Sequence, residues 1–349
     1  MAEETTIELK RAALNHYFQN LNTPQQQAVF HVNGPVLVLA GAGSGKTTAM
    51  IHRIVQMIHF GDGWVQANAS ITKEDTAYLK DYIADKQPAD LERLCSILAV
   101  QPIQPWHILA ITFTNKAANE LRSRLLQAIG EECASMLHAS TFHSACVRIL
   151  RRSISKLGYD SNFTIYDTDD SQRLMKSCIA DADVSEKQFP PRAVLTEISL
   201  AKDRMCSPEY FCIEAGSDYR KMVIGKLYKE YQNRLKSANA LDFDDLIYKT
   251  VELLESFPEE LEYYQNRFRY IMVDEYQDTN HAQFRLVQLL SQKHQNLCVV
   301  GDDDQSIYRF RGATIENILN FEKQFQNAVV IRLEQNYRST KTILEAAND

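Results

Sequence analysis

The chain has 349 residues, of which 45% are hydrophobic and 24% charged, a composition ordinary for globular proteins but long for a single core. It contains no run of 18 apolar residues that would span a bilayer and no basic, apolar leader after Met1, so we expect a cytoplasmic protein of several lobes. The net charge of −7 argues against an extended nucleic-acid surface and restricts any DNA site to a local patch.

Four short apolar runs are each followed at once by polar residues, at 34–40, 108–113, 270–273 and 297–300. This pattern is typical of buried parallel strands that carry functional loops at their carboxyl ends. The first run ends in a glycine-rich turn, and a helical pattern follows it. The sequence therefore predicts an α/β fold with a doubly wound parallel sheet.

Two stretches interrupt this alternation. Residues 61–105 are polar and mostly helical, and their chemical role is not evident. Residues 144–236 have helical periodicity and few strand-like runs, which predicts a helical insertion that splits the α/β domain. The insertion begins with a basic cluster, Arg148, Arg151, Arg152 and Lys156, which suits either DNA phosphates or a solvated helix face.

Residues 40–47 read Ala-Gly-Ala-Gly-Ser-Gly-Lys-Thr, which matches the P-loop pattern except that alanine replaces the first glycine. In such a loop the backbone N–H groups surround the phosphates, Lys46 reaches the β and γ oxygens, and the Thr47 hydroxyl ligates Mg²⁺. A coincidental glycine-rich turn is the alternative, but the flanking strand and helix disfavour it. We therefore expect nucleotide contacts from Gly41, Ala42, Gly43, Ser44, Gly45, Lys46 and Thr47.

The strand-like run at 270–273 ends in Asp274 and Glu275. Adjacent carboxylates repel one another, so a purely structural sheet would avoid them. Asp274 can hold Mg²⁺, and Glu275 can accept a proton from an attacking water molecule. Together with the P-loop, this pair indicates hydrolysis of a nucleoside triphosphate.

Residues 274–278, Asp-Glu-Tyr-Gln-Asp, resemble the DExQD signature of the superfamily 1 DNA helicases of the UvrD/Rep/PcrA family. Further stretches resemble motifs of this family and occur in the family's order. They are the adenine-reading Q motif at 21–29, motif Ia at 112–118, the next DNA-contacting motif at 140–144, motif III at 301–313 and motif IV at 333–339.

The resemblance implies a RecA-like P-loop domain formed by residues 1–143 and 237–330, with a helical inserted domain at 144–236 between the two parts. Residues 331–349 would begin a second RecA-like domain. Because family motifs V and VI lie further downstream, we expect the chain to be an incomplete motor that is weak or inactive alone.

The resemblance also implies roles at the nucleotide. Gln25 would read the adenine edge, for which its amide offers both a donor and an acceptor. Tyr337 would stack on the base, and Thr48 stands where relatives often carry an arginine near it. Gln305 would sense the γ-phosphate, and Arg338 would act as the arginine finger.

On the DNA side, single-strand binding needs aromatic faces for stacking and polar groups for phosphates. The resemblance assigns this role to Phe113, Asn115, Thr141, Phe142, His143, Tyr308, Phe310 and Arg311. Phe113 and Phe142 also fit a simpler role as core residues at strand ends. Phe310 departs from the tryptophan that is frequent in relatives, so its stacking is expected to be weaker.

The implied function is ATP- and Mg²⁺-dependent 3′-to-5′ translocation on single-stranded DNA, with unwinding at duplex junctions during DNA repair or replication. Two alternatives remain open. The chain would be the motor half of a helicase-nuclease, or a module that binds ATP and DNA without turnover. The sequence does not identify the proteins that would load such a motor.

Overall fold

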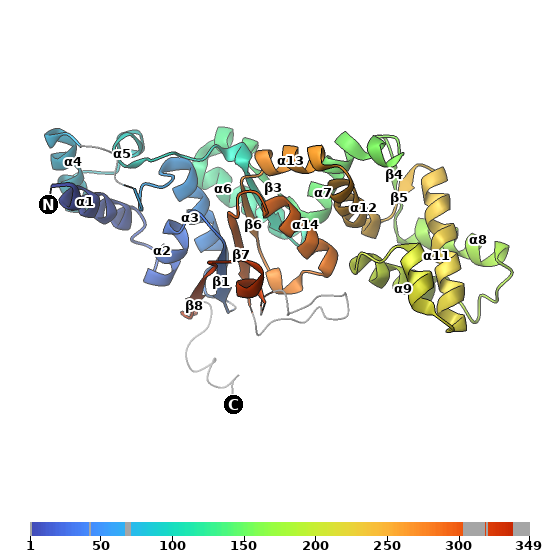
Figure 1. Cartoon of the computed structure of the whole chain (residues 1–349). Coiled ribbons are helices and arrows are strands. Elements are labelled where there is room, and N and C mark those ends of the chain that lie inside the picture. Colours follow the sequence, from blue (N-terminus) through green and yellow to red (C-terminus); the bar gives the residue numbers. More distant parts are fainter. Residues whose placement is uncertain (1, 42, 67–70, 303–317, 319, 338–349) are drawn as a thin grey trace, which may run out of the picture.

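The computed structural model describes residues 2–41, 43–66, 71–302, 318 and 320–337. The sheet lies in the middle of an elongated molecule, with α1, α4 and α5 at one end and α8, α9 and α11 at the other (Figure 1). Among the described helices, none is long and apolar enough to cross a membrane.

Six parallel strands form the central sheet in the order β3-β2-β6-β7-β1-β8. β1 lies between β7 and β8, and Val36 is in register with both Cys298 and Val329. The predicted α/β fold with a parallel sheet is therefore confirmed. The strand bounds are β1 Val36–Ala40, β2 Ile108–Thr112, β3 His138–Thr141, β6 Tyr270–Val273, β7 Leu297–Gly301 and β8 Val329–Leu333.

Helices cover both faces of the sheet, which explains why β1, β6 and β7 are apolar throughout. Alternate strand residues point to opposite faces, so Val36 and Val38 join one core while Leu37 and Leu39 join the other. The first core contains residues of α1 Ala2–Tyr17, α2 Thr23–Phe30, α3 Lys46–His59, α4 Lys73–Ile83, α5 Leu91–Leu98 and α6 Asn115–Met136. The second contains residues of α7 Phe142–Ser153, α12 Phe243–Ser256, α13 Pro258–Arg267, α14 His281–Ser291 and α16 Phe321–Gln324.

A third core lies inside the helical insertion. It is built from α8 Thr168–Asp181, α9 Pro191–Asp203 and α11 Tyr219–Ser237, with α10 Pro208–Ala215 packed on α11. A two-stranded parallel sheet, β4 Thr164–Ile165 with β5 Ala240–Leu241, joins the entry and exit of this unit. Short 3₁₀ turns complete the described elements, at η1 Pro105–His107, η2 Ile154–Leu157 and η3 Tyr276–Asp278.

Two predicted boundaries need correction. Residues 144–153 belong to α7, whose buried side chains pack on the sheet, so the separate helical core starts with α8 and not at residue 144. At the other end, β8 pairs with β1 as far as Leu333, so residues 331–333 belong to the first sheet and not to a second domain. Both errors arise because local periodicity does not reveal which core an element joins.

The basic cluster of Arg148, Arg151, Arg152 and Lys156, on α7 and η2, contacts protein partners. Lys156 pairs with Glu259 at 2.5 Å and with Glu260 at 3.2 Å. The Arg152 guanidinium lies 3.5 Å from the centroid of the Tyr263 ring and pairs with Glu260. This arrangement favours a solvated helix face over a phosphate site.

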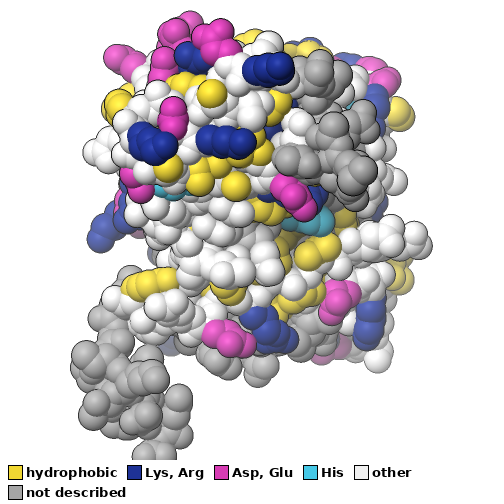
Figure 2. All heavy atoms as spheres, turned by 90° about the vertical axis from the view of Figure 1, so that its left-hand side faces the viewer, with side chains coloured by type: hydrophobic (Ala, Val, Ile, Leu, Met, Phe, Trp, Pro, Cys, Tyr) yellow, Lys and Arg dark blue, Asp and Glu magenta, His cyan; other side chains and the backbone are white. Residues whose placement is uncertain are grey.

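The stretch at 61–105 contains α4 and α5, as its helical pattern predicted. Its two ends meet where Gly61 bridges to Val100, and α4 packs against α1. Figure 2 views this end of the molecule and shows acidic, basic and apolar side chains mixed on one face. Such a mixed surface attracts neither anions nor cations strongly.

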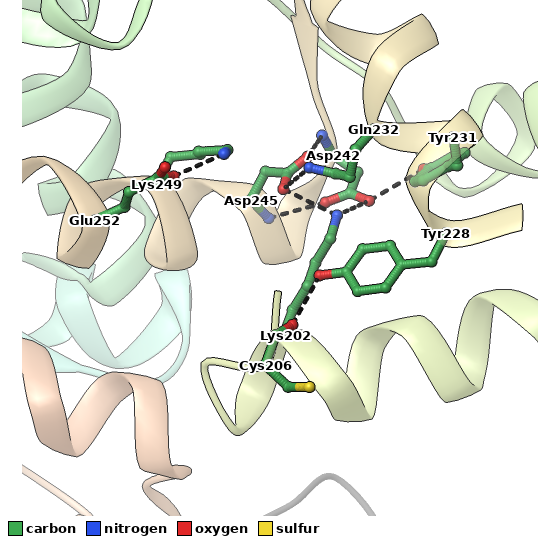
Figure 3. A network of polar contacts seen from close by, with 9 residues as sticks. All are labelled: Lys202, Cys206, Tyr228, Tyr231, Gln232, Asp242, Asp245, Lys249 and Glu252. Atoms are coloured by element: carbon green, nitrogen blue, oxygen red, sulfur yellow. Dashed lines mark hydrogen bonds and ion pairs between the residues drawn. The ribbon is translucent and has the colours of Figure 1, made fainter. Parts of the chain in front are cut away.

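A buried charge cluster joins the insertion to the sheet-covering helices (Figure 3). Lys202, at the end of α9 and 1% exposed, donates from Nζ to Asp242 at 2.7 Å and pairs with Asp245 at 2.9 Å. From α11, Tyr231 donates its hydroxyl to Asp242 at 3.0 Å, and Gln232 donates to Asp245 at 3.0 Å.

The electrostatics of the cluster depend on its single lysine. Burial opposes the charge on Lys202, but Asp242 and Asp245 outweigh this effect and raise its pKa. Burial likewise opposes ionisation of Asp242, yet Lys202 lowers the pKa of that carboxyl. Burial, followed by the charge on Asp242, raises the pKa of Asp245 to about 6. Removing Lys202 would therefore leave Asp242 and Asp245 without the buried positive charge that pairs with both.

We expect Lys202→Met to lower the free energy of unfolding by about 3–5 kcal/mol, the usual cost of breaking a buried ion pair by removing one partner. Urea denaturation followed by circular dichroism measures this change. The matched control is Lys176→Met, because the Lys176–Glu186 pair is exposed at 66% and 51%. The control should cost about 0–1 kcal/mol, and equal losses in the two variants would contradict the assigned role of the buried cluster.

Candidate nucleotide and DNA site

The carboxyl ends of parallel strands meet at one edge of the sheet, and four predicted motifs follow those ends. The glycine-rich loop follows β1, residues 113–114 follow β2, α7 follows β3, and the acidic pair follows β6. One continuous cleft of 1290 Å³ opens beside these segments, and side chains of the helical insertion form its opposite wall.

The P-loop leads directly into α3, which begins at Lys46. Gly45 precedes it with φ +84°, a left-handed conformation that favours glycine. A Cβ at this position would also collide with the Gln25 side chain. Gln25 donates from Nε2 to the Ser44 carbonyl at 3.1 Å, so a residue of the Q motif stabilises the glycine-rich loop.

Lys46 and Glu275 face one another across the loop. Lys46 Nζ lies 3.3 Å from Glu275 Oε2 and 3.9 Å from Asp302 Oδ2. Gln277 donates from Nε2 to the same Glu275 oxygen at 2.8 Å, and its Oε1 accepts from the Asp302 backbone at 3.0 Å. These contacts hold a carboxylate and a cation together at the strand ends.

Glu275 itself has a left-handed backbone, with φ +50° and ψ +45°. A residue other than glycine costs about 1–2 kcal/mol in this region. The short turn η3, which follows Glu275, is closed by backbone bonds from Asp278 to Glu275 at 3.0 Å and from Thr279 to Tyr276 at 3.2 Å. From this backbone conformation the Glu275 carboxylate reaches Lys46.

Asp274 is buried beside Glu275 and accepts a hydrogen bond from the Glu275 backbone at 3.0 Å. Burial, and then the charge on Glu275, raises the pKa of Asp274 to about 6. Thr47 and Asp274 both line the cleft, and hard oxygen ligands of this kind suit Mg²⁺. Among the described residues, no group of three or more His, Cys, Asp and Glu side chains could hold a metal ion.

Tyr337 lies against both the Q motif and the P-loop. Its backbone N–H donates to Gly43 O at 2.8 Å, and its hydroxyl accepts from Asn22 Nδ2 at 2.8 Å. The side chain is 56% exposed and lines the cleft, as does Thr48. A base-stacking role for Tyr337 fits this position and stays a prediction.

The Gln25 amide has protein partners at both ends. Its Oε1 accepts from the Asn22 backbone at 3.1 Å in the capping box of α2, while its Nε2 bonds Ser44. Gln25 is also buried. Adenine reading by Gln25 stays a prediction, while these two contacts give the side chain a structural role between α2 and the phosphate loop.

The residues predicted to bind DNA differ in how deeply they are buried. Phe142 is 2% exposed in the core behind the sheet, and its ring lies 5.5 Å from that of Phe113 in an edge-to-face arrangement. Thr141 is buried and caps α7 by accepting from Ser144 N at 3.2 Å. Phe142 also lines the cleft, but its nearly buried ring fits the simpler role as a core residue, and DNA stacking by Phe142 stays a prediction. Asn115 is exposed at the start of α6, and Phe113 and His143 line the cleft.

The sequence analysis missed Phe243, the first residue of α12. Phe243 is 54% exposed in the cleft, and its ring lies 5.7 Å from that of His143. The available signal was an aromatic residue between carboxylates, in Asp242-Phe-Asp-Asp, because such a position is unsuited to a core. Six other candidates lie outside the described residues: Ala42, Gln305, Tyr308, Phe310, Arg311 and Arg338.

A parallel sheet with a P-loop after β1 and an acidic pair after β6 defines a RecA-like P-loop fold. The family model of the UvrD/REP helicase N-terminal domain matches residues 21–67 and 91–326, and the chain belongs to this family. The family predicted from the motifs is thus confirmed. The unmatched residues 68–90 contain α4.

Among its relatives are two proteins named ATP-dependent DNA helicase PcrA. The chain is 47% identical over 335 residues to the one from Bacillus subtilis and 46% identical over 338 residues to the one from Staphylococcus aureus. The alignments cover 96% and 97% of this chain but 40% of each relative. The chain therefore spans about 40% of the length of these relatives.

We expect Asp274→Asn to raise the stability of the fold while weakening any Mg²⁺ response. The folded pKa of about 6 lies above the ordinary 3.8, so ionised Asp274 destabilises the fold at neutral pH. The advantage of the variant should be absent below about pH 4, grow up to about pH 6 and then stay constant, reaching about 3 kcal/mol at most. Thermal unfolding across this pH range measures it, and a constant difference at all pH values would contradict the assignment.

The two phenylalanines at this edge should respond differently to truncation. Phe243→Ala should weaken binding of a single-stranded oligonucleotide by about 1–3 kcal/mol per lost stacking contact, with little change in stability. Phe142→Ala should instead lower the free energy of unfolding by about 3–5 kcal/mol. Fluorescence anisotropy and urea denaturation of both variants distinguish these outcomes, and a Phe243→Ala variant that binds DNA normally would refute the stacking role.

Proposed function

We propose that the chain is the nucleotide-hydrolysing part of an ATP-dependent DNA helicase that translocates 3′ to 5′ on single-stranded DNA and separates strands at duplex junctions. The observation that carries this proposal is the Lys46–Glu275 pair at 3.3 Å, in a cleft that residues of the DNA motifs also line. Family membership and the names of the relatives support it. Work in DNA repair or replication is part of the same proposal.

In this proposal Glu275 acts as general base on the water that attacks the γ-phosphate. Gln277 and Lys46 hold its carboxylate in place, as the contacts at 2.8 and 3.3 Å indicate. Lys46 also stabilises the charge that develops on the phosphate oxygens. Thr47 and Asp274 would hold a Mg²⁺ ion, which supplies further positive charge at the β and γ oxygens.

In this proposal the residues for hydrolysis and the residues for DNA binding lie in the same cleft. Phe113 and His143 lie in the same cleft as Lys46 and Glu275, and Phe243 adds an exposed ring beside His143. Stacked bases would lie between the sheet edge and the helical insertion. Two other functions are the alternatives to this proposal. The chain would be a module that binds ATP and DNA without turnover, or the motor half of a helicase-nuclease.

We expect this chain to bind ATP with Mg²⁺, and Lys46→Ala to weaken that binding by about tenfold or more, equivalent to about 1.4 kcal/mol. Glu275→Gln should keep binding but lower turnover by about 10²- to 10⁴-fold, the usual contribution of a general base. Steady-state hydrolysis with and without single-stranded DNA, together with titration of a fluorescent ATP analogue, measures both effects.

The matched controls are Lys80→Ala and Glu131→Gln, which change exposed residues of α4 and α6. Both should behave like the parent chain. Binding of ATP without hydrolysis in the parent chain would favour the module without turnover. Hydrolysis that persists in Glu275→Gln would remove Glu275 from the mechanism.

A further inference from the structure

The catalytic loop is short and is held at both ends. Its first residue, Glu275, contacts Lys46, and η3 follows at once. Within the turn, the Thr279 hydroxyl donates to Tyr276 O at 2.7 Å, and Thr279 is fully buried. Only four residues separate Glu275 from Asn280, and the backbone bonds of η3 link them, so we expect a shift of the Glu275 backbone to move Asn280 as well.

Asn280 has two separate contacts. As the N-cap of α14, it accepts from Gln283 N at 2.9 Å through Oδ1. Through Nδ2 it donates to Asp203 Oδ1 at 2.5 Å, across the boundary between the motor domain and the helical insertion. Asn280 and Asp203 both line the cleft. The capping contact uses the oxygen and the cross-boundary contact uses the nitrogen, so the two can be removed separately.

Asp203 is the last residue of α9 and directly follows Lys202 (Figure 3 shows Lys202 in its cluster). The Lys202 cluster ties this end of α9 to α11 and to the start of α12. α9 also packs against α14. A displacement of Asp203 would therefore act on the packed end of α9, which is bonded to α11 and α12, and not on an isolated side chain.

We propose that Asp203 is a positioning residue of the helical insertion, which holds the Glu275–Thr279 loop through Asn280 and transmits the nucleotide state of that loop to α9. The inference rests on the proposed function, because it presumes that nucleotide binds beside Lys46 and Glu275. It extends that function by naming one contact through which the insertion responds to nucleotide.

The contact tolerates either protonation state of Asp203. Burial, and then the carboxylate of Asp244, raises the pKa of Asp203 to about 7. Near neutral pH the carboxyl group is therefore partly protonated. Both the acid and the anion offer an oxygen that accepts from an amide, so an amide oxygen at position 203 should also suffice.

Hydrogen–deuterium exchange of α9 tests the proposal in the whole chain, with and without a non-hydrolysable ATP analogue and Mg²⁺ at concentrations that saturate each variant. In the parent chain, nucleotide should slow exchange at the end of α9 by about fivefold or more, the lower range of site-to-site coupling. Asn280→Ser keeps an N-cap oxygen but loses the amide donor. This variant and Asp203→Ala should both abolish the response.

Two further variants sharpen the test. Asp203→Asn retains an acceptor oxygen and should keep the response. Asp181→Ala, at the end of α8, removes a carboxylate that pairs with Arg234 at 2.8 Å inside the insertion, and it should also keep the response. A response that survives in both Asn280→Ser and Asp203→Ala overturns the proposal, as does its loss in Asp203→Asn.

Two measurements on the parent chain distinguish failure of this inference from failure of the proposed function. Nucleotide binding without any change in α9 overturns the coupling alone and leaves the proposed function intact. Absence of nucleotide binding, measured by titration of a fluorescent ATP analogue, overturns the proposed function and this inference with it.

Discussion

Every neighbouring pair in the six-stranded sheet is parallel, and a parallel pair requires the chain to cross over before it can return. The crossovers supply the helices that cover both faces, and they bring all the carboxyl ends of the strands to one edge. The P-loop after β1 and the acidic loop after β6 meet there, although more than two hundred residues separate Lys46 from Glu275 in the chain. The remaining site residues depend on this arrangement.

Several features at the carboxyl edge of the sheet destabilise the fold. Glu275 has a left-handed backbone, and Asp274 is a buried carboxyl with a raised pKa. Burial also raises the pKa of Asp203, on the insertion side of the cleft. Such conformations and charges persist only where the surrounding structure holds them. Both apolar cores of the sheet and the Lys202 cluster provide that support. Strain and buried charge thus collect at the same edge as the candidate chemistry.

Local signals predicted much of the fold correctly. Strands buried on both faces are apolar throughout, so β1, β2, β6 and β7 were visible as short runs, and the P-loop followed the first of them. Local signals were least informative where burial depends on distant residues. Phe142 follows a strand, as Phe113 does, yet α12 and the rest of the second core cover its ring. Phe243 was overlooked because its exposure depends on how α12 lies against the cleft.

The sequence by itself determined the class of fold and the family, and it located the glycine-rich loop and the acidic pair, because these depend on short runs whose spacing is local. Only the tertiary structure decided that α7 belongs to the sheet's core, that β8 completes the sheet, that Gln25 supports the P-loop and that Asn280 meets Asp203. Each of these contacts joins elements from separate parts of the chain. Their geometry depends on how the three cores pack together, and no local pattern of residues encodes that packing.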